Sequence, residues 1–121
     1  MTWVVVVVVD LYMRRLVERV LRDDGLDVRS AANGSEALGS LDGEQPGVIV
    51  LDLIMPVMDG RTFFRKARNA GVTSPVLILA ATGGRKAAAE LSADGFMGKP
   101  FDPIRFCAAV RELLHSTLNV A

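Results

Sequence analysis

Three charged residues of this sequence, Asp10, Asp52 and Lys99, each come directly after an apolar stretch. A carboxylate that ends an apolar run loses hydration, so it is rarely there for packing alone. An ionised aspartate can act as a nucleophile or bind a divalent cation, and a lysine ammonium can neutralise a phosphoryl oxygen or a carboxylate. The structural alternative for each aspartate is a helix cap or a loop residue. Whether the three residues do chemistry depends on whether the fold brings them together.

The alternation of apolar runs and helical stripes predicts the elements that position these residues. The β-branched run Val4–Val9 is typical of a strand buried on both faces of a parallel sheet. Further strands are predicted at 26–31, 48–51, 75–80 and 96–98. A helix follows each strand, with Ser35 predicted to cap the second helix and Asp102 or Pro103 to begin the last. Strict alternation of five strands and five helices implies a three-layer α/β/α domain over residues 1–121.

In such a sheet the carboxyl ends of the strands share one edge, where functional groups gather. Asp10, Asp52 and Lys99 follow the first, third and fifth predicted strands. We therefore expect them to form one site.

Composition narrows the class of function. Half of the 121 residues are hydrophobic and 14 basic residues balance 14 acidic ones, so no basic surplus favours direct nucleic-acid binding. The apolar opening ends at Asp10 and is too short for a membrane span or signal peptide. The single cysteine, Cys107, excludes an internal disulfide and fits a reducing compartment. These features predict a cytoplasmic protein without a membrane partner.

Two motifs give the candidate residues a specific context. Asp52 is followed by Leu-Ile-Met-Pro-Val-Met-Asp-Gly, which ends at Gly60, and Lys99 is followed by Pro-Phe. Together with Asn-Gly-Ser-Glu-Ala-Leu at 33–38, they resemble the receiver domains of bacterial two-component response regulators over nearly the whole chain. The resemblance implies a flavodoxin-like, doubly wound, five-stranded parallel sheet of order 2-1-3-4-5 with five helices. It also implies a cis peptide bond between Lys99 and Pro100.

The resemblance assigns roles to individual residues. Asp52 would accept a phosphoryl group from a histidine kinase, a phosphotransfer protein or a small phosphodonor, and Lys99 would neutralise the phosphoryl oxygens. Ala80 and Phe96 occupy the positions of the family's conformational switch. A magnesium ion would be held by Asp52, the backbone carbonyl of Ile54 and an acidic pair after the first strand. The domain would then signal, without being a turnover enzyme, through its fourth helix, fifth strand and fifth helix. Its partner there would be a downstream protein or a second copy.

The sequence departs from the family pattern at the metal site and at the switch. Counting back from Met13 places the acidic pair on Val8 and Val9, which cannot bind a metal, with Asp10 in the next position. Ala80 lacks the family's hydroxyl, and Thr82 could replace it only if the loop bends back. The stretch between Ala80 and Lys99 is short, so a short fourth helix is expected.

The net charge of the site predicts how well it binds magnesium. A complete site has three carboxylates and one lysine, so its net charge is −2 and matches a divalent cation. Here the charges of Asp52 and Lys99 cancel, and even with Asp10 turned inward the net charge of the site is only −1. We expect weak or absent magnesium binding, with Lys99 directly on Asp52. A one-residue shift that makes Asp10 a ligand is the alternative. Phe96 either lies inward beside Ala80 or packs on the last helix.

Other functions of an α/β domain fit the sequence less well or remain as alternatives. The same fold could serve as a pseudo-receiver, a binding module independent of phosphorylation. A haloacid-dehalogenase-type phosphatase needs a second aspartate where Ile54 stands, and neither a flavin-binding nor a dinucleotide-binding phosphate loop follows the first strand.

Arg14 and Arg15 are predicted to be a solvated pair on the first helix. Cys107 is predicted to be a buried hydrophobe, and His115 a residue without catalytic partners. Because the chain ends one helix after Lys99, we expect a stand-alone or excised receiver.

Overall fold

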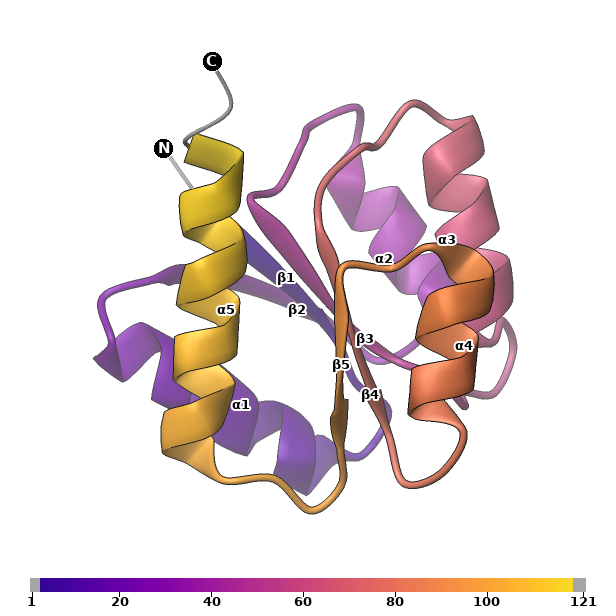
Figure 1. Cartoon of the computed structure of the whole chain (residues 1–121). Helices are drawn as coiled ribbons and strands as arrows, with labels where there is room; N and C mark the ends of the chain where they lie inside the picture. Colours follow the sequence, from indigo (N-terminus) through magenta and orange to yellow (C-terminus); the bar gives the residue numbers. More distant parts are fainter. Residues whose placement is uncertain (1–2, 119–121) are drawn as a thin grey trace.

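The computed structural model describes the backbone of residues 3–118 and the side chains of residues 3–115. It contains a five-stranded parallel sheet of order β2-β1-β3-β4-β5, as predicted (Figure 1). The strands are β1 (Trp3–Val7), β2 (Asp27–Ala31), β3 (Val48–Asp52), β4 (Val76–Ala80) and β5 (Gly95–Gly98). The helices are α1 (Leu11–Asp23), α2 (Gly34–Leu41), α3 (Gly60–Asn69), α4 (Gly84–Leu91) and α5 (Pro103–Leu118).

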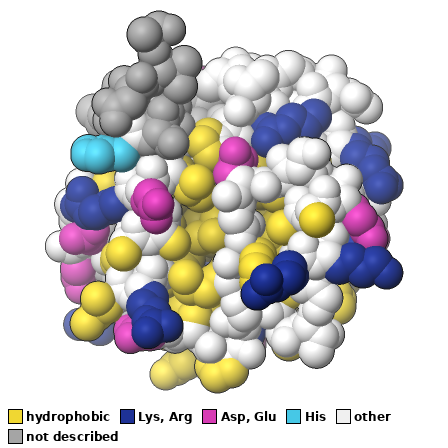
Figure 2. Space-filling view, viewed as in Figure 1, with side chains coloured by type: hydrophobic (Ala, Val, Ile, Leu, Met, Phe, Trp, Pro, Cys, Tyr) yellow, Lys and Arg dark blue, Asp and Glu magenta, His cyan; other side chains and the backbone are white. Residues whose placement is uncertain are grey.

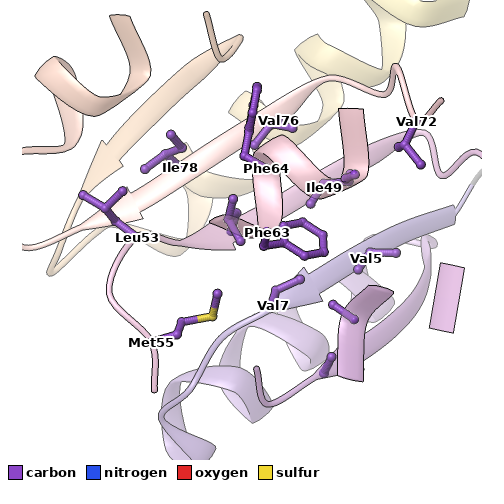
Figure 3. Packing of buried hydrophobic residues seen from close by; sticks show 14 of the residues in the cluster. Val5, Val7, Ile49, Leu53, Met55, Phe63, Phe64, Val72, Val76 and Ile78 are labelled. Atoms are coloured by element: carbon purple, nitrogen blue, oxygen red, sulfur yellow. The ribbon is translucent and has the colours of Figure 1, made fainter. Parts of the chain in front are cut away.

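The helices cover both faces of the sheet and divide the core into two layers. Helices α1 and α5 lie on one face, and α2, α3 and α4 lie on the other (Figure 1). Successive residues of β1 point to opposite layers, so its valines supply both clusters and are fully buried. Figure 3 shows the layer under α3, where Phe63 faces Val7 of β1. The double coverage explains why β1, β3 and β4 are apolar along their whole length.

Side-chain caps begin four of the helices at the carboxyl edge of the sheet, and Asp102 caps α5 by accepting from the Ile104 amide at 2.8 Å. Asp10 caps α1 by accepting from the Met13 amide at 2.7 Å, and Asp59 caps α3. Asn33, rather than the predicted Ser35, caps α2 by accepting from the Glu36 amide at 2.9 Å. The prediction was wrong because the helix begins at Gly34, two residues earlier than a cap at Ser35 would place it. These caps fix where the chain leaves each strand.

The ends of the predicted strands differ from the observed ones. Strand β1 was predicted to reach Val9 but its ladder ends at Val7, so Val8 and Val9 form the connection to α1. Helix α4 has eight residues, in line with the short helix that the spacing predicted.

The opposite edge of the sheet carries the chain's single tryptophan. Trp3 begins β1, belongs to the buried core and is 8% exposed, and the Arg29 guanidinium of β2 lies 3.8 Å from its ring centroid. This is a cation–π geometry. Within residues 3–118, none of the helices combines the length and the apolar character that a bilayer crossing requires.

Candidate functional site

Asp52 is the last residue of β3 and the buried centre of the carboxyl edge. It is 2% exposed and is as buried as the apolar residues that precede it in the strand. Strand β4 lies on one side of it and β1 on the other, so both strand ends converge on its carboxylate. A buried carboxylate at this place needs polar partners to offset its lost hydration.

Two groups satisfy the carboxylate of Asp52. The Val9 amide donates to Oδ2 at 3.1 Å, and the Lys99 ammonium is in direct ionic contact with Oδ1. Oδ1 accepts no hydrogen bond within the described part of the chain, so the charge of Lys99 is what compensates it. The Lys99 side chain is 28% exposed and therefore links the buried acid to the surface. The predicted Asp52–Lys99 pair is present.

The backbone around Lys99 orients its side chain across the end of β4. Its amide donates to the Ala80 carbonyl at 3.0 Å, which continues the β4–β5 pairing by one residue. The Lys99–Pro100 peptide bond is cis, as predicted. Because β4 separates β5 from β3, the long lysine side chain is needed to reach Asp52 from this position.

The loop after Asp52 is held against the end of the strand by Gly60. The Gly60 amide donates to the Leu53 carbonyl at 2.9 Å. A Cβ at position 60 would lie 2.9 Å from the Leu53 Cα and closer still to the Asp52 carbonyl oxygen. Only glycine permits this approach, which explains the glycine that ends the motif.

Two other residues shape the same loop. Asp59 accepts from the Thr62 amide at 2.8 Å, and this hydrogen bond holds the pKa of Asp59 below its usual 3.8. Val57 has a φ of 68°, and the amide of the next residue, Met58, donates to the carbonyl of the preceding residue, Pro56, at 2.6 Å. This is a γ-turn with a β-branched residue in the left-handed region, which is a strained conformation.

The carboxyl end of β1 contains no acidic pair facing Asp52. Val8 is fully buried, Val9 is partly buried, and Asp10 is exposed with one oxygen occupied as the α1 cap. Within the described residues, no three aspartate, glutamate, histidine or cysteine side chains lie together as a metal site. With Lys99 already on the Asp52 carboxylate, the donor set does not fit a magnesium ion.

Arg14 is the residue that sequence reasoning missed. Instead of being solvated, it turns back from α1, and its guanidinium donates to the Val8 carbonyl at 3.0 Å and the Val9 carbonyl at 3.3 Å. The prediction of a solvated pair was therefore wrong for Arg14. Its position in the first turn of α1, close in sequence to the end of β1, was the available signal.

The switch positions are close to each other but lack the family's chemistry. Ala80 ends β4 and is buried, whereas Thr82 is exposed in the following loop. Phe96 is 36% exposed, and a Cβ on Gly84 would lie 3.2 Å from the Phe96 ring and 3.3 Å from the Ala80 Cβ. The Arg85 guanidinium lies 5.2 Å from the Phe96 ring centroid. Phe96 thus packs on the start of α4 near Ala80, but it is partly exposed and does not lie inward as one of the two predicted positions required.

Exposed apolar side chains lie in the segments that leave the carboxyl edge of the sheet. Leu11 and Tyr12 begin α1, Ile54 and Val57 belong to the loop after Asp52, and Ile104 is in the first turn of α5. They are between 52% and 85% exposed. We call these five residues the apolar rim.

Cys107 and His115 lie outside the site on α5. The Cys107 thiol is partly buried and contacts the Val20 carbonyl at 3.7 Å, and burial raises its pKa. His115 is exposed.

The fold and the buried acid–lysine pair define the class: a flavodoxin-like, doubly wound protein whose site lies at the carboxyl edge of the sheet. The family model for the response regulator receiver domain matches residues 4–111. The chain therefore belongs to the response regulator receiver domain family. It is a signalling domain of two-component systems.

Individual relatives agree with this assignment. The chain is 36% identical over 113 residues to the probable transcriptional regulator ycf27 of Cyanophora paradoxa, covering 91% of this chain and 47% of the relative. It is 35% identical over 129 residues to the alkaline phosphatase synthesis transcriptional regulatory protein SphR of Synechococcus elongatus, covering 96% and 50%. The chain thus spans about half the length of these relatives. The chemotaxis protein CheY4 of Vibrio cholerae superposes with a TM-score of 0.84 at 29% identity, covering 93% of this chain and 98% of CheY4. These relatives do not favour the pseudo-receiver alternative.

Proposed function

We propose that this receiver domain accepts a phosphoryl group on Asp52 and signals by presenting the phosphorylated state to a partner. A carboxylate oxygen of Asp52 attacks the phosphorus of the donor, a bond forms between that oxygen and phosphorus, and the bond to the leaving group breaks. The leaving group keeps the electron pair, and the product is an acyl phosphate. The ionic contact between Lys99 and Asp52 is the observation that carries this proposal.

Lys99 supports the step in two ways. Its compact charge neutralises the phosphoryl oxygens that arrive beside the carboxylate. Because Asp52 is 2% exposed and the Lys99 side chain is 28% exposed, the ammonium also covers the nucleophile. Movement of Lys99 from Oδ1 to the incoming phosphoryl group uncovers Asp52 and keeps the positive charge in place.

The donor partner in this proposal is a histidine kinase or a phosphotransfer protein that docks on the apolar rim. Its five exposed apolar side chains are consistent with a docking surface next to the nucleophile. A cytoplasmic location is part of the proposal, supported by the single unpaired cysteine.

The output surface in this proposal is the face of α4, β5 and α5. Figure 2 shows apolar side chains between α5 and β5 on this face. Met97, Phe101 and Leu113 belong to this region and are only partly buried. A downstream protein or a second copy would bind here, and Phe96 under Arg85 would be the aromatic group that reports the state of the site.

Phosphorylation by a small acyl phosphate tests the proposal. The protein is incubated with acetyl phosphate, with magnesium chloride and separately with EDTA, and intact mass is measured. We expect one added phosphoryl group in at least one condition. Asp52→Asn abolishes it, and Asp59→Asn, a change of the exposed aspartate in the same loop, retains it. Absence of the adduct in both conditions, or its presence in Asp52→Asn, would refute Asp52 as the acceptor.

A further inference from the structure

The peptide unit between Val8 and Val9 lies between a cation and the phosphoacceptor. Its carbonyl, on Val8, accepts from the Arg14 guanidinium at 3.0 Å. Its amide, on Val9, donates to Asp52 Oδ2 at 3.1 Å. The two ends of a trans peptide point in opposite directions, so one planar group connects Arg14 to Asp52.

This connection strengthens the amide as a donor. A cation on the carbonyl oxygen polarises the peptide and increases the positive charge on its amide hydrogen, and hydrogen bonds in such chains reinforce one another. Arg14 also holds the Val9 carbonyl at 3.3 Å, which fixes the segment after β1. Asp52 therefore has an oriented, polarised amide on one oxygen and the ammonium of Lys99 on the other.

The charges of this arrangement suit a phosphoryl group without a metal. Lys99 and Arg14 contribute +2 and Asp52 contributes −1, giving a formal +1 before phosphorylation. An acyl phosphate carries a charge of about −2, which brings the sum close to zero. A site with additional carboxylates would need a divalent cation to reach the same balance.

We propose that Asp52 accepts its phosphoryl group without a divalent cation, and that Arg14 is a positioning residue that acts through the Val8–Val9 peptide. The inference rests on the proposed function. The atoms and electrons are those of the step above, with an acyl phosphate as the donor and a carboxylate as the leaving group. Lys99 contacts the reacting oxygens directly, whereas Arg14 keeps the Val9 amide oriented toward them.

The metal requirement is tested first by the rate of phosphorylation. Acetyl phosphate is added to the wild-type protein in excess EDTA or in excess magnesium chloride, and the adduct is followed by intact mass. We expect initial rates within about twofold of each other, because removing a metal that the site does not bind removes no binding or transition-state interaction. A rate at least tenfold lower in EDTA would overturn the inference and leave the proposed function standing. No adduct in either condition would overturn both.

Metal binding is measured independently of phosphorylation. Manganese(II) is titrated into the protein and free manganese is followed by electron paramagnetic resonance. We expect wild type to bind no more tightly than Tyr12→Asp, which adds an exposed carboxylate on α1. Val9→Asp places an acid beside Asp52 and is expected to bind at least tenfold more tightly. Binding by wild type that equals binding by Val9→Asp would contradict the inference.

The role of Arg14 is tested by substitution and by the resonance of one amide. In Arg14→Gln the Val9 amide proton is expected to shift upfield and the rate in EDTA to fall by about tenfold. This is less than the loss of about 10²–10³-fold when a preorganised donor is removed, because the Val9 amide itself remains. Arg14→Lys restores part of both, because it returns the cation. Arg19→Gln, an exposed arginine on the same helix, is the control and leaves both unchanged.

A folded-state check accompanies these variants, namely the dispersion of amide resonances and the thermal midpoint. An unchanged Val9 resonance and rate in a folded Arg14→Gln protein would show that Arg14 does not act through the peptide. If Arg14→Gln does not fold, the comparison of Arg14→Lys with wild type decides the question. A partial change of the Val9 resonance and of the rate in folded Arg14→Lys then supports the action of a cation at position 14, and either no change or a full loss overturns it.

Discussion

Replacing Lys99 with methionine leaves the buried carboxylate of Asp52 without the ammonium that contacts it. At a charge separation of about 4 Å and an effective dielectric constant near 20, the gross attraction is about 4 kcal/mol. Removing one partner of a buried ion pair costs about 3–5 kcal/mol, because the other charge remains buried. The partial exposure of Lys99 and the remaining Val9 hydrogen bond favour the lower end of this range. We expect Lys99→Met to reduce the free energy of unfolding by about 3 kcal/mol.

A double-mutant cycle followed by urea unfolding measures this coupling. With an m value of about 2 kcal/mol/M, the expected loss lowers the urea midpoint by about 1.5 M. Asp52→Asn removes the buried charge while Lys99 can turn to solvent, so this variant and the double variant Asp52→Asn/Lys99→Met are expected to lie within about 1 kcal/mol of wild type. Lys86→Met, at an exposed position on α4, is the control and changes stability by at most about 0.5 kcal/mol.

The cycle can also refute the reasoning. A coupling energy below about 0.5 kcal/mol, with Lys99→Met as stable as Lys86→Met, would mean that the ion pair does not stabilise Asp52. The electrostatic description of the site would then be wrong, although the fold would be unaffected.

Three further predictions concern residues around the site and on α5. Gly60→Ala is expected to cost more than about 2 kcal/mol in urea unfolding because its Cβ meets backbone atoms, whereas Gly39→Ala, with open space, stabilises by about 0.5–1 kcal/mol. Asp59→Ala is expected to cost about 1 kcal/mol at neutral pH. Since the pKa of Asp59 is lowered, this contribution is complete above pH 3.8 and is lost as pH falls through the lowered pKa, which urea unfolding against pH would detect. Burial raises the pKa of Cys107, so a thiol reagent at pH 8 should react more slowly with this thiol than with free cysteine, and equal rates would contradict the burial.

Most of the fold could be predicted because it depends on patterns that are local in sequence. Continuous apolar runs marked the buried strands, and alternation with helical stripes required parallel pairing. The pair of Asp52 and Lys99 followed from the same logic, since both residues end strands at one edge and lysine can cross the end of β4. The order of the strands was available only through the resemblance to a family.

The errors concern side chains whose partners are set by three-dimensional position. Periodicity assigned Arg14 to the polar face of α1, but the guanidinium reaches back to carbonyls that the ladder leaves free once β1 ends at Val7. Phe96 was expected to lie inward beside Ala80 or to pack on α5, and instead it is partly exposed and packs on Gly84, whose lack of a side chain leaves space for the ring. Neither contact has a signature in spacing alone.

The position of Trp3 at the amino end of β1 determines what the protein's intrinsic fluorescence can report. Trp3 begins β1 and Asp52 ends β3, so nearly a full strand length of about 15 Å separates the indole from the carboxylate. Emission from this indole should therefore monitor global unfolding faithfully while remaining insensitive to events at the acceptor. Ligand titrations read through tryptophan would miss genuine binding, and a reporter dye near the loop after β3 would be the better choice.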